Sequence, residues 1–175
     1  MCDEQNSLRA VVMTGLFAAM IYIGIWVLRI PLPAVVGRPF IHFGNTLTAV
    51  AILYLGFRNG ALAGIIGLGG FDILNGYAAT SWLTMLEVVV VAAILSAVYK
   101  GMKYNDSKKN IIILAVIAGV TKIFTSYATM VVAALMAGTA LQPALVAAFL
   151  SLLATVINSC STAVCTPILY FALKD

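Results

Sequence analysis

Six apolar segments, separated by short polar stretches, set the pattern of this chain. They cover residues 8–28, 44–57, 61–74, 82–99, 111–136 and 141–173. A helix needs about 20 apolar residues to cross a bilayer, and the first and the last three segments approach or exceed that length. The pattern therefore predicts an all-α integral membrane bundle of six transmembrane helices, in one domain that covers residues 1–175.

The second and third segments are shorter than a full span. The sequence FRNG at residues 57–60 separates them, and its Asn-Gly pair is typical of a turn. We therefore expect two short helices joined as a hairpin, with their polar ends held inside protein or facing water.

Composition supports the membrane assignment. The chain is 63% hydrophobic and only 9% charged, whereas a soluble domain carries about 25% charged residues. So high an apolar fraction also argues against a β-barrel, whose strands alternate apolar and polar positions. The three cysteines and the single histidine form no metal-binding motif, so neither a metal nor a cofactor is expected.

The positive charges predict the orientation. Arg9, Arg58, Lys174 and the four lysines between residues 100 and 109 fall on one side of the predicted bundle. Only Arg29 and Arg38 fall on the other side. The positive-inside rule then places both termini in the cytoplasm of a cell-membrane protein.

The loop at residues 29–41 is the longest on the outer face. It reads RIPLPAVVGRPFI, and its three prolines and one glycine make it non-helical but stiff. An apolar loop of this kind is expected to fold over a cavity as a lid; a simple packed connector is the alternative.

Ionisable residues within the apolar segments are candidate functional residues, because each is costly in lipid unless it is paired or hydrated. These are Asp72, Glu87 and Lys122, with His42 at a segment boundary. At its predicted depth Lys122 needs a carboxylate partner, and either acid could serve. The other acid would remain for a ligand.

Uncharged polar and aromatic residues cluster with these groups. Ser126 shares a helical face with Lys122, and Tyr127 lies beside it. The last segment carries a polar stripe, and the junction of the third and fourth segments carries aromatic and amide side chains. Their members are Ser151, Thr155, Asn158 and Thr162 in the stripe, and Asn75, Tyr77 and Trp82 at the junction.

We expect these groups to converge on an outward-facing pocket for a small, planar compound bearing hydroxyl or amino groups. Structural alternatives exist for each of them. Ser, Thr and Asn bridge membrane helices, Tyr77 and Trp82 suit an interfacial aromatic belt, and a Lys122 ion pair can be purely structural.

Other features bear on partners. No ATP-binding, hydrolase or nucleic-acid-binding motif is present, so the chain is expected to be a binder or carrier rather than an enzyme. In the first segment, Gly15 and Ala19 have the spacing of small residues that lets another helix approach closely. The partner helix is either another protein or another helix of the same bundle.

The motifs HFGN at residues 42–45 and GGFDILNGY at residues 69–77 resemble those of the S components of energy-coupling factor (ECF) transporters. The likeness is to the group related to riboflavin, hydroxymethylpyrimidine and pyridoxine uptake. It implies high-affinity binding of a vitamin or precursor near the outer face. It also implies docking, through the first helix, on a transmembrane coupling subunit that two cytoplasmic ATPases power.

The resemblance also bears on the site residues. The candidate pocket residues are Asn45, Asp72, Glu87, Lys122, Tyr127 and Asn158, with Tyr77 and Trp82 as stacking residues. His42 is expected to order the hinge of the lid and to give the site at most a modest pH sensitivity near neutrality.

Glu87 departs from the pattern of the family that the chain resembles, which usually has a lysine in helix four. A carboxylate there favours hydroxymethylpyrimidine or a pyridoxine-like vitamer over anionic vitamins, although Lys122 weakens the inference. The alternative function is a stand-alone, ion-coupled secondary carrier, although no inverted repeat is evident. An intramembrane enzyme is a third and more remote alternative.

Overall fold

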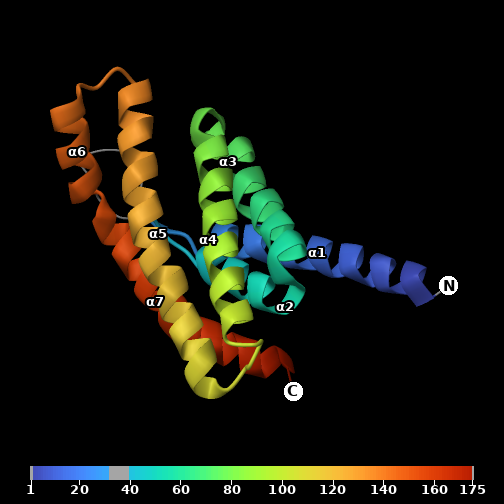
Figure 1. Cartoon of the computed structure of the whole chain (residues 1–175). Coiled ribbons are helices and arrows are strands. Elements are labelled where there is room, and N and C mark those ends of the chain that lie inside the picture. The colour runs from blue at the N-terminus through green and yellow to red at the C-terminus, as the bar shows by residue number, and fades with distance from the viewer. Residues whose placement is uncertain (1, 32–39, 175) are drawn as a thin grey trace.

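The computed structural model describes residues 2–31 and 40–174, so Arg38 and most of the predicted lid lie outside the described residues. The described chain is almost wholly helical (Figure 1). Its helices are α1 (Cys2–Val27), α2 (Gly44–Gly64), α3 (Gly70–Leu74), α4 (Ser81–Gly101), α5 (Lys108–Met136), α6 (Leu141–Leu150) and α7 (Leu152–Lys174). The prediction of an all-helical membrane bundle is thus confirmed in outline.

Short irregular elements connect some of these helices. A π-helical turn, η1 (Ile65–Gly69), joins α2 to α3, and a 3₁₀ turn, η2 (Ala78–Thr80), leads into α4. Two short strands, β1 (Ile30–Pro31) and β2 (Phe40–Ile41), pair antiparallel at the two ends of the loop after α1. This pairing fixes where the predicted lid begins and ends.

Five helical stretches in the described residues are long and apolar enough to cross a membrane. They are Ser7–Val27, Gly44–Leu74, Ala78–Gly101, Lys108–Met136 and Leu152–Lys174. The helix α6 is shorter and lies beside α5 in Figure 1.

The stretch from Gly44 to Leu74 reverses direction on itself. Gly56 has φ 76° and ψ −176°, a backbone conformation that side-chain-bearing residues rarely adopt. Beyond it, Gly60 lies against the backbone of Ile52, and Gly64 lies against Thr48 and Val88. Two short antiparallel helical arms therefore stand where one long helix would otherwise run.

The last apolar segment differs from its prediction, because it forms two helices rather than one. The break lies at Ser151, whose backbone N–H is shared between the carbonyls of Ala147 and Ala148 at 3.1 and 3.2 Å. Its hydroxyl also donates to the Ala147 carbonyl at 2.8 Å, a contact that often bends helices. Beyond this break, Ala154, Thr155 and Asn158 of α7 are buried.

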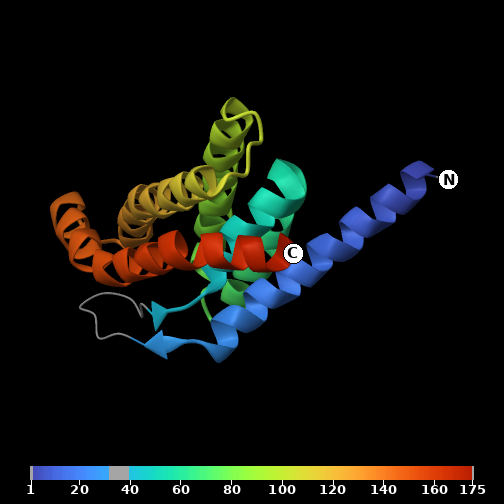
Figure 2. The same ribbon diagram turned by 90° about the horizontal axis from the view of Figure 1, so that it is seen from below.

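The first helix packs through one face only. Phe17, Ile21 and Ile25 are buried, whereas Gly15 and Ala19 lie on the exposed face. Figures 1 and 2 both show the N-terminal part of α1 extending beyond the other helices. The small residues singled out in the sequence are therefore available to a further helix rather than used inside the bundle.

Candidate substrate-binding site

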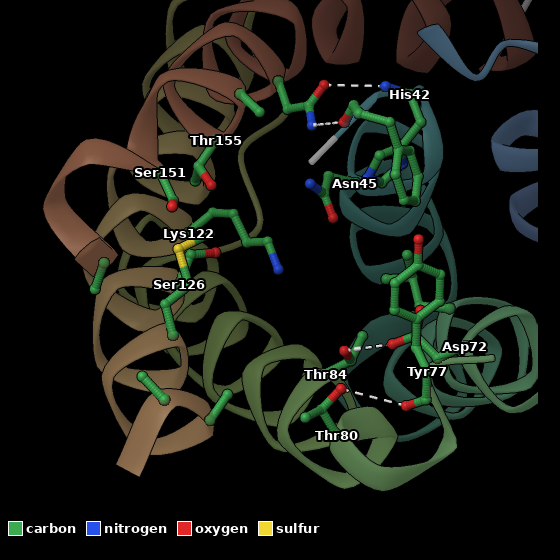
Figure 3. Close-up of a pocket in the computed structure, with 18 of the residues that line it drawn as sticks. His42, Asn45, Asp72, Tyr77, Thr80, Thr84, Lys122, Ser126, Ser151 and Thr155 are labelled. Carbon is green, nitrogen blue, oxygen red and sulfur yellow. Dashed lines mark hydrogen bonds between the residues drawn. The ribbon is translucent and has the colours of Figure 1, made fainter. Parts of the chain in front are cut away.

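A cavity of about 440 Å³ lies between α2–α4 on one side and α5–α7 on the other (Figure 3). Alanines at residues 133, 134, 137, 147 and 148, from α5, its C-terminal cap and α6, line one part of it together with Met130. The rest of the lining mixes apolar residues with polar residues from α2, α3, α4, α5 and α7. An apolar enclosure with a few converging polar groups is typical of a small-molecule site.

Two charged side chains face this cavity from opposite walls. Asp72 of α3 accepts a hydrogen bond from the Thr84 hydroxyl at 2.5 Å. Lys122 of α5 is directed into the cavity (Figure 3) and forms an ion pair with Glu87 of α4. Of the two acids that could pair with Lys122, Glu87 is therefore its partner. Asp72 lines the cavity without a cationic partner among the described residues.

Glu87 does not line this cavity. It is buried, with only 5% of its surface exposed, and its second carboxylate oxygen accepts from Thr129 at 2.9 Å. A separate void of about 20 Å³ adjoins Glu87, Lys122 and Asn45, which is room for about one water molecule. Glu87 therefore acts on the main cavity only through Lys122.

Aromatic rings form one end of the site. The Phe40 ring lies 6.4 Å from Tyr77, 5.9 Å from Phe71 and 5.1 Å from His42, measured between ring centroids. Arg29 covers this group: its guanidinium lies 4.4 Å from the Phe40 ring centroid and donates to the Tyr77 hydroxyl at 3.0 Å. The stack holds the loop after α1 against the end of α3.

Asn158 fastens the strand β2 to helix α7. Its side-chain carbonyl accepts from the His42 backbone N–H at 3.0 Å, and its amide group donates to the Phe40 carbonyl at 3.1 Å. These bonds are drawn as dashed lines in Figure 3. The Asn158 side chain therefore holds the backbone of Phe40 and His42, both of which line the cavity, in place against α7.

His42 is held as a neutral imidazole. Its Nδ1 accepts from the Gly44 backbone N–H at 3.0 Å, so this nitrogen carries no proton. Burial, which is the largest cause, and the positive charges of Lys122 and Arg29 together lower the pKa of His42 to about 3. This direction of the pKa shift keeps His42 neutral near pH 7, within the expectation of at most a modest pH sensitivity there.

Acid should destabilise the protein through this histidine. Because the folded pKa lies below the ordinary value of 6.5, the unfolded chain binds the proton first, and stability falls as the pH drops below 6.5. We expect about 1.4 kcal/mol of lost stability per pH unit from this group, down to the folded pKa. Thermal unfolding of wild type and His42→Gln between pH 7 and 4.5 measures it: the wild type should lose more. Parallel curves would show that His42 is protonated in the folded protein as well.

The structure brings most of the predicted site residues together. His42, Asn45, Asp72, Tyr77, Lys122 and Asn158 all line the cavity. Trp82 and Tyr127 do not: Trp82 is 48% exposed on α4, and the Tyr127 hydroxyl reaches the Leu145 carbonyl at 3.5 Å, between α5 and α6. The aromatic ring that lies near Tyr77 in the cavity lining is that of Phe40 rather than that of Trp82.

Sequence reasoning missed several lining residues. Phe40 and Thr84 adjoin segments that were singled out, but a single aromatic or threonine in an apolar chain carries little signal. The alanines of α5 and α6 were a better clue, since Ala133, Ala137, Ala144 and Ala148 recur at helical spacing and leave room between two adjacent helices. Of these, Ala133, Ala137 and Ala148 line the cavity.

A second large cavity, of about 340 Å³, lies at the opposite end of α2 and α4. Aromatic and aliphatic residues line it, among them Tyr54, Phe57 and Tyr99, and no charged side chain does. The first cavity is the better candidate because it combines charged, amide, hydroxyl and aromatic groups.

The fold is that of a multi-pass membrane protein, and its main cavity is a candidate site for a small molecule. A family model described as "ECF-type riboflavin transporter, S component" matches residues 5–175, and the chain belongs to this family. No curated protein and no solved structure matched the chain. Membership identifies a cell-membrane, vitamin-binding subunit that works with transmembrane and ATPase subunits of an ECF transporter and is not an enzyme by itself.

Proposed function

We propose that the chain captures a neutral or cationic planar N-heterocyclic vitamin in the 440 Å³ cavity, for import by its ECF partners. The observation that carries this proposal is the arrangement of charge. Lys122 is neutralised by Glu87, whereas Asp72 faces the cavity with an unneutralised carboxylate. A carboxylate in this position can accept a hydrogen bond from a ring N–H or an exocyclic amino group, and it disfavours an anionic substrate.

Riboflavin is the first substrate to test. The family is described by riboflavin transport, and the cavity falls in the volume range of about 300–1,000 Å³ that holds drug-sized ligands. The aromatic end at Phe40 and Tyr77 suits a ring system, and hydroxyl and amide groups suit a polyol. Asn45, Ser151 and Thr155 supply such groups.

Hydroxymethylpyrimidine and pyridoxine are the second candidates, favoured by the Asp72 carboxylate. Both are single rings with protonatable nitrogen and hydroxymethyl groups, which match one carboxylate and a few hydroxyls. Calorimetric titration of the purified protein with riboflavin, hydroxymethylpyrimidine and pyridoxine ranks the three compounds by affinity. We expect one vitamer to bind at least a hundredfold more tightly than pantothenate, which is anionic; equal binding of pantothenate would overturn the charge argument.

The proposal includes six transmembrane helices with both termini in the cytoplasm. The chain reversal at Gly56 supports two short spans in the stretch Gly44–Leu74, and the lysine-rich loop between α4 and α5 supports the orientation. Uptake in a host without the ATPase subunits separates this proposal from an ion-coupled carrier. Import should vanish in that host, and persistent import would favour the carrier.

The exposed small residues of α1 provide a prediction for partner docking. Nothing lies within 4 Å of a Cβ built at Gly15, and Ala19 is exposed, so leucine at both positions should not disturb the fold. We expect Gly15→Leu/Ala19→Leu to reduce vitamin uptake at least tenfold while the dissociation constant for the vitamin stays unchanged. Val12→Leu, on an exposed part of the same helix, is the control. Co-purification of the double variant with the coupling subunit at wild-type yield would contradict the prediction.

A further inference from the structure

We propose that Glu87 sets the charge selectivity of the site through Lys122, so that the site takes the free vitamer and rejects its phosphate ester. This inference rests on the proposed function, since it concerns the same cavity. It gives Glu87 the part of a positioning residue that does not touch the substrate.

The contacts of Glu87 support this role. Both of its carboxylate oxygens have partners within the protein, one with the ammonium of Lys122 and the other with the hydroxyl of Thr129. Glu87 is absent from the lining of the large cavity, whereas Lys122 lines both that cavity and the small void beneath it. Any effect of Glu87 on a ligand is therefore transmitted by the position and the charge of Lys122.

The balance of charges shows what the pair does. Without Glu87, the ammonium of Lys122 would offset the Asp72 carboxylate across the cavity. With Glu87, the three groups together carry one net negative charge, and His42 adds none because its imidazole is neutral. A phosphate ester brings about −1.5 to −2 charges at neutral pH. In this site it would meet repulsion from Asp72 and no free cation among the described lining residues.

The surroundings keep the pair in place. Lys122 and Glu87 adjoin a void of about one water's volume, lined also by Asn45, Thr48 and Thr162. The void also has apolar walls, formed by residues such as Leu68, Val88 and Ala118, and Glu87 is the hydrogen-bonding partner of the ammonium. Lys122 can therefore donate to a carbonyl or hydroxyl of a neutral vitamer while it stays paired with Glu87.

The test compares dissociation constants for riboflavin and for its 5′-phosphate, or for pyridoxine and its phosphate if pyridoxine is the vitamer that binds. In Glu87→Gln the uncompensated lysine should shift the affinity ratio at least tenfold toward the phosphate ester. Thr129→Val, which keeps the carboxylate, is the matched control, and its ratio should remain that of wild type. A Glu87→Gln ratio equal to that of wild type would overturn the inference.

A second variant is needed in case Glu87→Gln does not fold, because a buried charge without its partner is strongly destabilising. Lys122→Met leaves Glu87 as the uncompensated charge, and it should shift the ratio at least tenfold in the opposite direction. Glu87→Gln/Lys122→Met removes both charges and should restore stability, with rejection of the phosphate intermediate between the single variants. The affinity ratio should favour the phosphate ester most in Glu87→Gln, less in the double variant and least in Lys122→Met. Any other order contradicts the inference. Failure of the wild type to bind any free vitamer would instead defeat the proposed function itself.

Discussion

Asn158→Leu is expected to weaken vitamin binding about 30- to 100-fold. The variant removes two hydrogen bonds, one to the His42 N–H and one from the Asn158 amide to the Phe40 carbonyl. At about 1–1.5 kcal/mol each, their loss amounts to about 2–3 kcal/mol. This loss weakens binding because Phe40 and His42 line the cavity. Without the two hydrogen bonds of Asn158, binding of the substrate must also order these two residues.

A further measurement and a control variant distinguish the two hydrogen bonds of Asn158 from a direct contact between Asn158 and the substrate. Amide hydrogen exchange at His42 should be slow in the substrate-free wild type and fast in Asn158→Leu, since the hydrogen bond to the Asn158 side chain protects that N–H. Asn75→Ala is the matched control, because Asn75 donates only to the Phe71 carbonyl of its own helix and does not line the cavity. Fast exchange at His42 in the wild type would show that Asn158 does not hold the loop.

Gly60→Ala is expected to destabilise the protein by about 3 kcal/mol or more, the upper end of what overpacking costs. A Cβ at this position would lie 2.4 Å from the Ile52 Cα and 2.8 Å from its backbone nitrogen. Backbone atoms cannot rotate away as a side chain can, so the two arms of the α2 hairpin would have to separate. Thermal unfolding in detergent measures the change.

Gly70→Ala is the control for this prediction. Gly70 lies in the same hairpin, at the start of α3, and nothing lies within 4 Å of a Cβ built there. Alanine is the better helix former, so this variant should be as stable as wild type or up to about 1 kcal/mol more stable. Similar losses in both variants would show that the close packing of Gly60 on Ile52 is not what holds the hairpin.

The apolar pattern was informative about the fold because membrane helices must satisfy their own backbone hydrogen bonds, and long apolar runs have few other solutions. The hairpin between the second and third segments was also predicted, but its turn was placed wrongly: residues 57–60 are helical, and the break lies at Gly56, whose φ of 76° glycine adopts readily. The bend at Ser151 was not, because it depends on one hydroxyl bonding to the backbone inside a continuous apolar run. The π-helical turn Ile65–Gly69 likewise has no distinctive sequence pattern.

The site was predictable where charge in lipid limits the choices. Asp72, Lys122 and Asn158 were singled out because isolated polar groups in apolar segments need partners, and all three line the cavity. Which acid pairs with Lys122 was not predictable, since Asp72 and Glu87 have similar predicted depth and only packing decides between them. The aromatic end was also missed in part: Phe40 depends on the pairing of β1 with β2 and on the cover that Arg29 provides.

The most direct test is whether the cavity itself binds the vitamin. Ala133→Phe places a ring among the alanines of α5 that line the cavity, whereas Ala93→Phe places the same ring on the exposed face of α4. Calorimetric titration of both variants and the wild type with riboflavin, hydroxymethylpyrimidine and pyridoxine makes the comparison. We expect the wild type and Ala93→Phe to bind the same vitamer with equal affinity, and Ala133→Phe to bind it at least tenfold more weakly. Undiminished binding by Ala133→Phe would show that the vitamin binds elsewhere.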